Sequence, residues 1–211
     1  MDNTLILFMS DNGACAEPYE ELGGGKVEEV NNPASSFAPT YGRAWAQVSN
    51  TPFRKYKCRA YEGGISTPLI LSWKGALGNK KGKWCRVPGY LPDIMPTILE
   101  ATGAKYPETY HGGNKIYPLV GSSLFPAVHK KTDSLHEYMY WEHQNNRAIR
   151  WGNWKAIRDE KGKEWELYDV VKDRTERNNL AEQHPEVLTK LVAEWEKWAN
   201  ANFVLPKHPK K

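Results

Sequence analysis

The feature that most constrains the fold is an unbroken apolar run close to the N-terminus. Residues 4–9, TLILFM, are strand-forming and show no alternation of apolar and polar side chains. This pattern is typical of a strand buried on both faces of a parallel sheet, because a half-exposed strand would alternate. Such a strand needs neighbouring strands and covering layers, so we expect it to belong to a larger α/β sheet.

Two further apolar segments extend this prediction. Residues 68–73 form a second expected strand, and residues 92–103 predict a short helix that Asp93 caps and Gly103 ends. Residues 14–56 are rich in Gly, Pro, Asn and Ser, which are expected to break any helix there. This segment is too long for a plain connection and is therefore a functional loop or a linker. The order of elements indicates an α/β layer.

The character of the sequence changes near residue 133. Strand-forming runs alternate with turn signals through residues 138–169, and Gly152-Asn153 is typical of a two-residue hairpin loop. We therefore expect a small antiparallel meander. A helix is expected from Pro185, with an apolar stripe that packs against the meander as core. The stripe consists of Leu188, Leu191, Trp195 and Trp198.

Composition excludes several classes of protein. Twenty-nine Lys and Arg against 25 Asp and Glu give a formal net charge of +4, which does not indicate a nucleic-acid-binding protein. We expect the basic residues 206–211 to be a frayed tail. No stretch is apolar and long enough to span a membrane, and we expect no signal peptide within these residues. The three cysteines form no CxxC pair, so a structural zinc site is not expected.

The first expected strand ends in Asp11-Asn12-Gly13. In open α/β sheets, ligands bind at the carboxyl ends of strands. The Asp11 carboxylate and the Asn12 amide are hard oxygen donors, suited to calcium or magnesium and poor for zinc. The same three residues also form an excellent turn, and spacing alone leaves both interpretations open.

A second candidate segment begins at Lys57 and continues to the paired glycines Gly63-Gly64. Paired glycines permit close approach of two backbones. A lysine just before a strand is able to direct its ammonium at an anion as a compact charge. The alternative is that Lys57 belongs to a solvated basic loop with Arg54, Lys55 and Arg59.

These segments resemble the type I sulfatases of the alkaline-phosphatase-like superfamily. NTLILFMSDNG at residues 3–13 is similar to the second metal-binding segment of that family. KCRAYEGGISTP at residues 57–68 resembles its lysine-plus-Glu-Gly-Gly-Ile segment, and DIMPT at residues 93–97 resembles its next helix. Further similar segments occupy residues 154–155, 166–169 and 173–180. The motifs occur in the family's order, so we expect the C-terminal portion of a sulfatase.

The resemblance implies an α/β fold with two domains. Residues 1–132 would be the C-terminal part of the sulfatase α/β sheet domain. Residues 133–211 would be a small subdomain of antiparallel strands with one long helix. The chain is then expected to lack the N-terminal half of the sheet domain, and to self-associate through an exposed sheet edge.

The resemblance also implies hydrolysis of the sulfate ester of a sugar or an aryl alcohol. Asp11 and Asn12 would be two of the ligands of a calcium ion, which acts as a Lewis acid. Lys57 would contact the sulfate. In the segment EHQNNR at residues 142–147, His143 would contact the substrate, with a hydrogen-bonded turn residue as the equal alternative. The other histidines are expected at the surface.

One departure from the family pattern is large. The family's nucleophile is a formylglycine made from a C/S-x-P-x-R motif, and these 211 residues contain no such motif. We therefore expect the chain alone to be inactive. Two alternatives stay open: a metal-dependent phosphatase or phosphodiesterase of the same superfamily, and a non-catalytic carbohydrate-binding fragment. The expected partner is a sulfated small molecule or glycan. Sulfatases are usually periplasmic, secreted or lysosomal, and the sequence does not assign a compartment.

Overall fold

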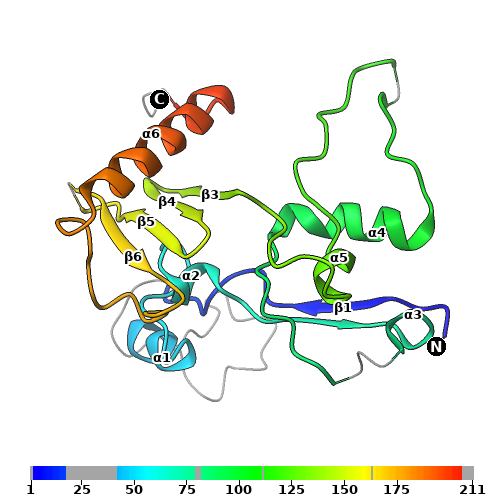
Figure 1. Cartoon of the computed structure of the whole chain (residues 1–211), viewed down its shortest axis with the longest axis horizontal. Coiled ribbons are helices and arrows are strands. Elements are labelled where there is room, and N and C mark those ends of the chain that lie inside the picture. The colour runs from blue at the N-terminus through cyan, green and yellow to red at the C-terminus, as the bar shows by residue number, and fades with distance from the viewer. Residues whose placement is uncertain (1, 18–41, 79–81, 111, 163, 206–211) are drawn as a thin grey trace, which may run out of the picture. The chain divides into compact units, whose positions relative to one another are not determined.

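The computed structural model of the 211-residue chain describes residues 2–17, 42–78, 82–110, 112–162 and 164–205 (Figure 1). The elements are β1 (Ile6–Met9), α1 (Gly42–Ser49), α2 (Glu62–Ile65), β2 (Leu69–Ser72), α3 (Lys74–Leu77), η3 (Leu91–Asp93), α4 (Ile94–Thr102), α5 (Phe125–Val128), β3 (Tyr138–His143), β4 (Asn146–Trp151), β5 (Trp154–Arg158), β6 (Glu166–Asp169) and α6 (Pro185–Ala201). This mixture confirms the predicted α/β class, and the two predicted strands at residues 4–9 and 68–73 are β1 and β2.

The described strands form two sheets. Strand β1 pairs with β2, and the other four form a sheet in the order β3-β4-β5-β6. The chain groups into two compact units. The first unit contains Met1–Phe8 and Ile70–Met139, and the second contains Met9–Leu69 and Tyr140–Lys211. Each unit thus combines segments that are far apart in the sequence, and the predicted domain boundary at residue 133 stays a prediction.

Strand β1 differs from its prediction in burial. The side chains of Ile6 and Phe8 are 43% and 68% exposed, so the expected burial on both faces is wrong for the described residues. The physical reason is that β1 has one strand neighbour, β2, within the described ranges, and nothing described there covers Ile6 and Phe8. A strand of this composition therefore exposes apolar surface.

Helix α4 follows its prediction at its C-terminal end but not in the role of Asp93. Gly103 ends it in the left-handed conformation, with φ of 69°. Asp93 occupies the N-terminal cap position, but its carboxylate does not bond to the first turn of α4. It accepts hydrogen bonds from the backbone N–H groups of Tyr90 (2.7 Å) and Ser122 (2.8 Å) and lies 2.7 Å from His136 Nε2. The expectation of a surface His136 is therefore wrong, since its side chain is 11% exposed.

Helix α1 was not expected within residues 14–56. The Gly- and Pro-rich composition there suggested that no helix forms, yet Gly42–Ser49 is helical and buries Ala46 completely. Side-chain hydrogen bonds to residues just beyond the helix explain the difference. The Gln47 side chain donates to the carbonyl of Phe53 (2.8 Å) and accepts from the N–H of Lys55 (3.0 Å). The predicted helix breakers at residues 23–25 and 31–33 lie outside the described residues.

The antiparallel meander is confirmed. Strands β4 and β5 pair from Arg147↔Arg158 to Trp151↔Trp154, and β5 pairs with β6 from Trp154↔Asp169. The tight β4–β5 turn places Gly152 at φ of 56°, a conformation that glycine adopts without steric cost. The two-residue turn that the sequence predicted therefore sets the register in which β4 pairs with β5.

Helix α6 packs on the meander through the predicted stripe. Leu191 and Trp195 are completely buried, and the Trp195 indole N–H donates to the carbonyl of Trp141 (3.1 Å). The rings of Tyr140 and Trp198 stack with centroids 4.9 Å apart. Each fully buried large apolar side chain contributes about 1.5–3 kcal/mol.

In the described part of the chain, no helix has the length and apolar character needed to cross a membrane.

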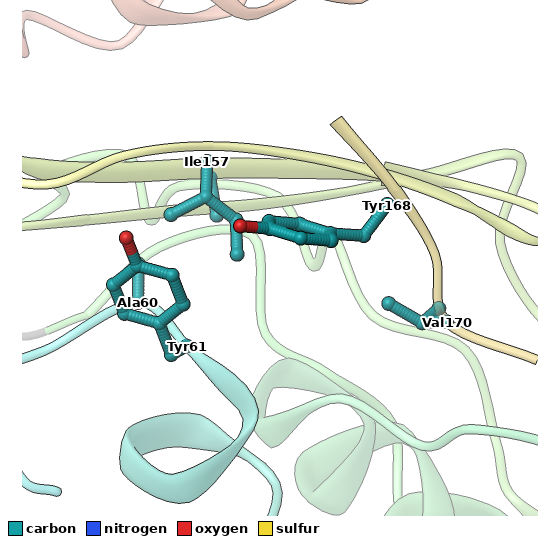
Figure 2. Close-up of a cluster of buried hydrophobic side chains, with 6 residues drawn as sticks. Ala60, Tyr61, Ile157, Tyr168 and Val170 are labelled. Atoms are coloured by element: carbon teal, nitrogen blue, oxygen red, sulfur yellow. The ribbon is translucent and has the colours of Figure 1, made fainter. Parts of the chain in front are cut away.

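The core of the second unit joins the meander to the segment before α2. Figure 2 shows Ala60 and Tyr61 lying against the strands that carry Ile157 and Tyr168. Both tyrosine hydroxyls donate to the same oxygen of Glu166, at 2.8 and 2.6 Å. The start of α2 is therefore fixed in place by packing and by hydrogen bonds.

Candidate functional site

The predicted metal-binding residues lie in the loop that follows β1. The Ser10 hydroxyl donates to the carbonyl of Asn12 (2.9 Å), and the Asn12 side-chain NH₂ donates to the carbonyl of Gly13 (2.8 Å). These bonds orient Asn12 so that its amide oxygen remains available. Asp11 is exposed, and no described group bonds to its carboxylate. The loop therefore presents two hard oxygen donors side by side.

Glycines bring this loop against α2. The Gly13 N–H donates to the carbonyl of Gly64 (3.0 Å). A Cβ atom at Gly13 would overlap the carbonyl oxygen of Gly63, and one at Gly64 would overlap the carbonyl oxygen of Arg59. The predicted close approach of backbones is confirmed, and no other residue type permits it without a shift of the chain.

The same contacts place Lys57 beside the loop. The Lys57 N–H donates to the carbonyl of Ala14 (3.0 Å), and its ammonium lies 2.9 Å from a Glu17 carboxylate oxygen and 3.8 Å from Cys15 Sγ. The hydrogen bond to Glu17 raises the pKa of Lys57, and the same bond lowers the pKa of Glu17. Lys57 therefore stays charged, and its side chain is 35% exposed and open to an anion.

His143 ends β3 and belongs to the same unit. His143 is exposed, and its backbone carbonyl accepts a hydrogen bond from the Asn146 side chain (3.1 Å). Gln144 and Asn145 follow in the left-handed conformation, so His143 directly precedes a tight turn. The charge of His143 contributes to the lowered pKa of Glu17, after the hydrogen bonds from Lys57 and Cys15. His143 makes only this smallest contribution to the pKa of Glu17, and no hydrogen bond joins it to Glu17 or Lys57 among the described residues.

An open, mainly polar hollow of about 510 Å³ lies over this loop. Asn12 and Cys15 line one side, and Ser49, Ser66 and Thr67 contribute hydroxyl groups. A hollow lined by amide and hydroxyl groups suits a polar ligand such as a sugar better than an apolar one.

A buried network of ion pairs connects α2 to the meander. Lys155 of β5 is completely buried, and its ammonium contacts Glu62 (2.9 Å) and Glu176 (2.8 Å). The Glu62 N–H donates to the second Glu176 oxygen (2.7 Å), and Arg174 bonds Glu62 (3.1 Å) and Ser66 (2.9 Å). Burial alone would raise the pKa of Glu62, but Lys155 and Arg174 lower it to about 2. The backbone that carries Gly63 and Gly64 is thereby tied to the meander.

The residues present fit part of a calcium site. Calcium takes six to eight oxygen ligands, and Asp11 and Asn12 supply two suitable ones. Among the described residues, no cluster of three or more His, Cys, Asp or Glu side chains surrounds a possible metal position. The donor chemistry therefore agrees with the predicted ion, and the described residues provide a minority of its ligands.

The sequence predicted Asp11, Asn12, Lys57 and His143 as site residues and gave no prediction for Glu17, which contacts Lys57. The site predictions for these four residues stay predictions, although the structure places them in one compact unit. Nothing in the sequence distinguishes Glu17 from the other acidic residues that follow it, because its partner Lys57 is 40 positions away. The ion pair is visible only once the loop is folded.

Comparison with known proteins identifies the family of this chain. The family described as N-sulphoglucosamine sulphohydrolase, C-terminal, matches residues 53–200, and the family described as Sulfatase matches residues 1–104. The chain belongs to the sulfatase family. This confirms the prediction that the chain is a C-terminal portion of a sulfatase in the alkaline-phosphatase-like superfamily. The matched ranges include the Asp11 loop, Lys57 and the meander.

Individual relatives agree with this assignment. This chain is 34% identical to an uncharacterised sulfatase of Schizosaccharomyces pombe, over 92% of this chain and 37% of the relative. It is 26% identical to an N-acetylgalactosamine-6-O-sulfatase of Bacteroides thetaiotaomicron, over 90% of this chain and 35% of that protein. The crystal structure of Ps i-CgsB in complex with k-i-k-neocarrahexaose matches 94% of this chain and 37% of that one, with a TM-score of 0.67 and 27% identity. The chain thus spans just over a third of the length of these relatives.

Proposed function

We propose that the chain contributes the Asp11 loop and Lys57 to an active site that hydrolyses the sulfate ester of a sugar. The observation that carries this proposal is the pair of backbone hydrogen bonds from Gly13 to Gly64 and from Lys57 to Ala14. They hold two oxygen donors and a charged ammonium on two neighbouring loop segments. A sulfate ester needs both kinds of group around it.

Each residue has a separate task in this proposal. Asp11 and Asn12 would hold a calcium ion, which when bound supplies Lewis-acid polarisation of the sulfate oxygens. Lys57 would bind a sulfate oxygen and stabilise the charge that develops on it. Glu17 would orient the Lys57 ammonium through their 2.9 Å contact, and a sulfate would replace this carboxylate contact with another anion. His143 would contact the leaving group or the sugar.

The relatives and the hollow support a sulfated sugar as the substrate. One relative is named for a sulfate on N-acetylgalactosamine, and the matched crystal structure contains a bound oligosaccharide. The hydroxyl- and amide-lined hollow beside Asn12 provides hydrogen-bonding groups of the type that sugar hydroxyls need.

The test is sulfate release with calcium present. The isolated chain is expected to show no turnover, because it contains no C/S-x-P-x-R motif to supply the covalent nucleophile. Turnover is therefore measured in a chimera in which residues 3–200 replace the matching part of the Schizosaccharomyces pombe sulfatase. Lys57→Ala in this chimera should lower turnover about 10²–10³-fold, as does removal of one preorganised charge-stabilising group. Asp11→Ala should cost at least as much.

Lys55→Ala is the matched control, because Lys55 lies in the same loop two residues away. It should leave turnover close to that of the unchanged chimera, because Lys55 is bonded through its backbone, which the substitution keeps. Equal losses in Lys55→Ala and Lys57→Ala would contradict a specific role for Lys57. Faster hydrolysis of the phosphate ester than of the sulfate ester of one phenol would favour the phosphatase alternative.

A further inference from the structure

A groove in the first compact unit combines an exposed indole ring with uncompensated positive charge. Residues 83–87 form one side of it, and the turn that follows α5 forms the other, enclosing about 470 Å³ of open space. We call it the Trp84 groove. Its lining includes Lys83, Trp84, Arg86, Val128, Lys130 and Asp133.

Trp84 is the most unusual member of the lining. Its side chain is 85% exposed, whereas tryptophan is highly buried on average. A solvent-facing indole is a flat apolar platform whose face attracts both apolar C–H groups and cations. Such a ring favours a ligand that has a flat apolar face and is otherwise polar, and a pyranose ring has this character.

The charges of the groove point to an anion. Lys83, Arg86 and Lys130 line it, and none of the three forms an ion pair with any residue that the structure describes. Asp133 is the single carboxylate in the lining, so the groove carries a net excess of two positive charges. Arginine binds two oxygens of an oxyanion such as phosphate through paired N–H groups, and lysine acts as a point charge.

The wall that carries Lys130 is well fixed. Phe125 of α5 is 7% exposed and lies 5.8 Å from the ring of Trp73. Backbone N–H groups of His129 and Lys130 donate to the carbonyls of Phe125 (2.8 Å) and Ala127 (3.0 Å), which closes the turn after the helix. The backbone that carries Lys130 is therefore held in place by the turn.

We propose that the Trp84 groove binds a sulfated oligosaccharide, with the indole stacked on one sugar ring and the three cations around its sulfate groups. This inference rests on the proposed function for the choice of ligand, since a sulfatase acts on the same chemistry. The groove would be a second binding site of this chain, distinct from the site that contains Lys57. Single-stranded nucleic acid also combines stacking with negative charge. The modest excess of two charges favours the glycan, because nucleic acids are usually met by a more extended basic surface.

The experiment measures binding by the whole 211-residue chain, without turnover. A fluorescein-labelled chondroitin 6-sulfate hexasaccharide is titrated at about 0.15 M ionic strength, where weak surface electrostatics are screened. Trp84→Ala should weaken binding about threefold to tenfold, the range expected for loss of one aromatic contact. Arg86→Gln should weaken it about twofold to fivefold, as for loss of one exposed ion pair.

Two control variants match these changes. Tyr117→Ala removes an aromatic side chain that is 84% exposed and lies outside the groove lining. Lys105→Gln removes an exposed cation of the same unit. Both should bind like the unchanged chain. The unsulfated hexasaccharide and a six-nucleotide DNA strand should both bind at least about fivefold more weakly, the loss expected when exposed ion pairs are missing.

The outcomes separate this inference from the proposed function. Unchanged binding by Trp84→Ala, equal binding of the unsulfated sugar or of DNA, or no binding at all would overturn the groove assignment. Loss of binding in Lys57→Ala alone would overturn it too and would assign the sugar to the Lys57 site. Groove binding together with an inactive chimera would leave this inference standing and reject the proposed catalysis.

Discussion

The buried ammonium of Lys155 makes the sharpest prediction about stability. Lys155→Met keeps the length and apolar stem of the side chain but removes the charge. Glu62 would retain Arg174, whose side chain is 52% exposed, whereas Glu176 would retain only the N–H of Glu62. Breaking a buried ion pair in this way costs about 3–5 kcal/mol, because an uncompensated charge stays behind. For a chain of this size the melting temperature should fall by about 6–20 °C.

The loss should depend on pH with a defined sign. Lys155 and Arg174 lower the pKa of Glu62 to about 2, so Glu62 contributes stability above its ordinary pKa of about 4.5. The unchanged chain loses this contribution as the pH falls from about 4.5 towards 2. Burial raises the pKa of Glu176, so in the variant this group takes up a proton readily. The difference between the two proteins should be largest near pH 7 and shrink in acid.

Urea denaturation followed by tryptophan fluorescence measures this, since Trp195 is completely buried in the same unit. Lys172→Met is the matched control. Lys172 contacts Asp169 at 3.3 Å, but its side chain is 84% exposed, so the cost should stay below about 1 kcal/mol. The reasoning would be refuted by equal stabilities of Lys155→Met and the unchanged chain, or by a loss that is the same at pH 7 and pH 4.

Three further predictions concern the loop and the strand at the start of the chain. Gly13→Ala should cost about 1–3 kcal/mol in thermal denaturation, because its Cβ would overlap the Gly63 carbonyl, whereas Gly89→Ala, which approaches only the Leu124 side chain, should cost less. Calcium should bind the isolated chain no more tightly than about 1 mM by calorimetry, since Asp11 and Asn12 supply two of its ligands, and tight stoichiometric binding would show that other ligands complete the site. The exposed side chains of Ile6 and Phe8 should make the chain self-associate in sedimentation experiments, and Phe8→Ser should reduce this, while a monodisperse monomer would contradict it.

Local signals account for the parts of the fold that the sequence predicted well. Gly152-Asn153 specified a hairpin, and Gly103 specified a helix end, because both depend on backbone conformations that few residues adopt. The apolar stripe of α6 specified the face that packs on the meander. In these elements the local preference and the tertiary environment agree.

Long-range contacts account for the parts that it did not predict. Lys155 is 93 positions from Glu62, so the sequence gives no sign that a lysine in a strand is completely buried. Asp93 was expected to serve its own helix, but Ser122 and His136 compete for its carboxylate. The site segments were found by resemblance, whereas the partner Glu17 and the network behind α2 became visible only in the folded chain.

The division of each compact unit into two distant segments has a consequence for synthesis on the ribosome. The segment that contains Glu62 is complete at Leu69, but its partner Lys155 lies 86 residues further along the chain. Because synthesis adds about 5–20 residues per second, about 4–17 s pass between the synthesis of Leu69 and that of Lys155. During that interval the apolar side chain of Tyr61 has no meander to pack against. The nascent chain should therefore be a substrate for holding chaperones until β5 has been synthesised.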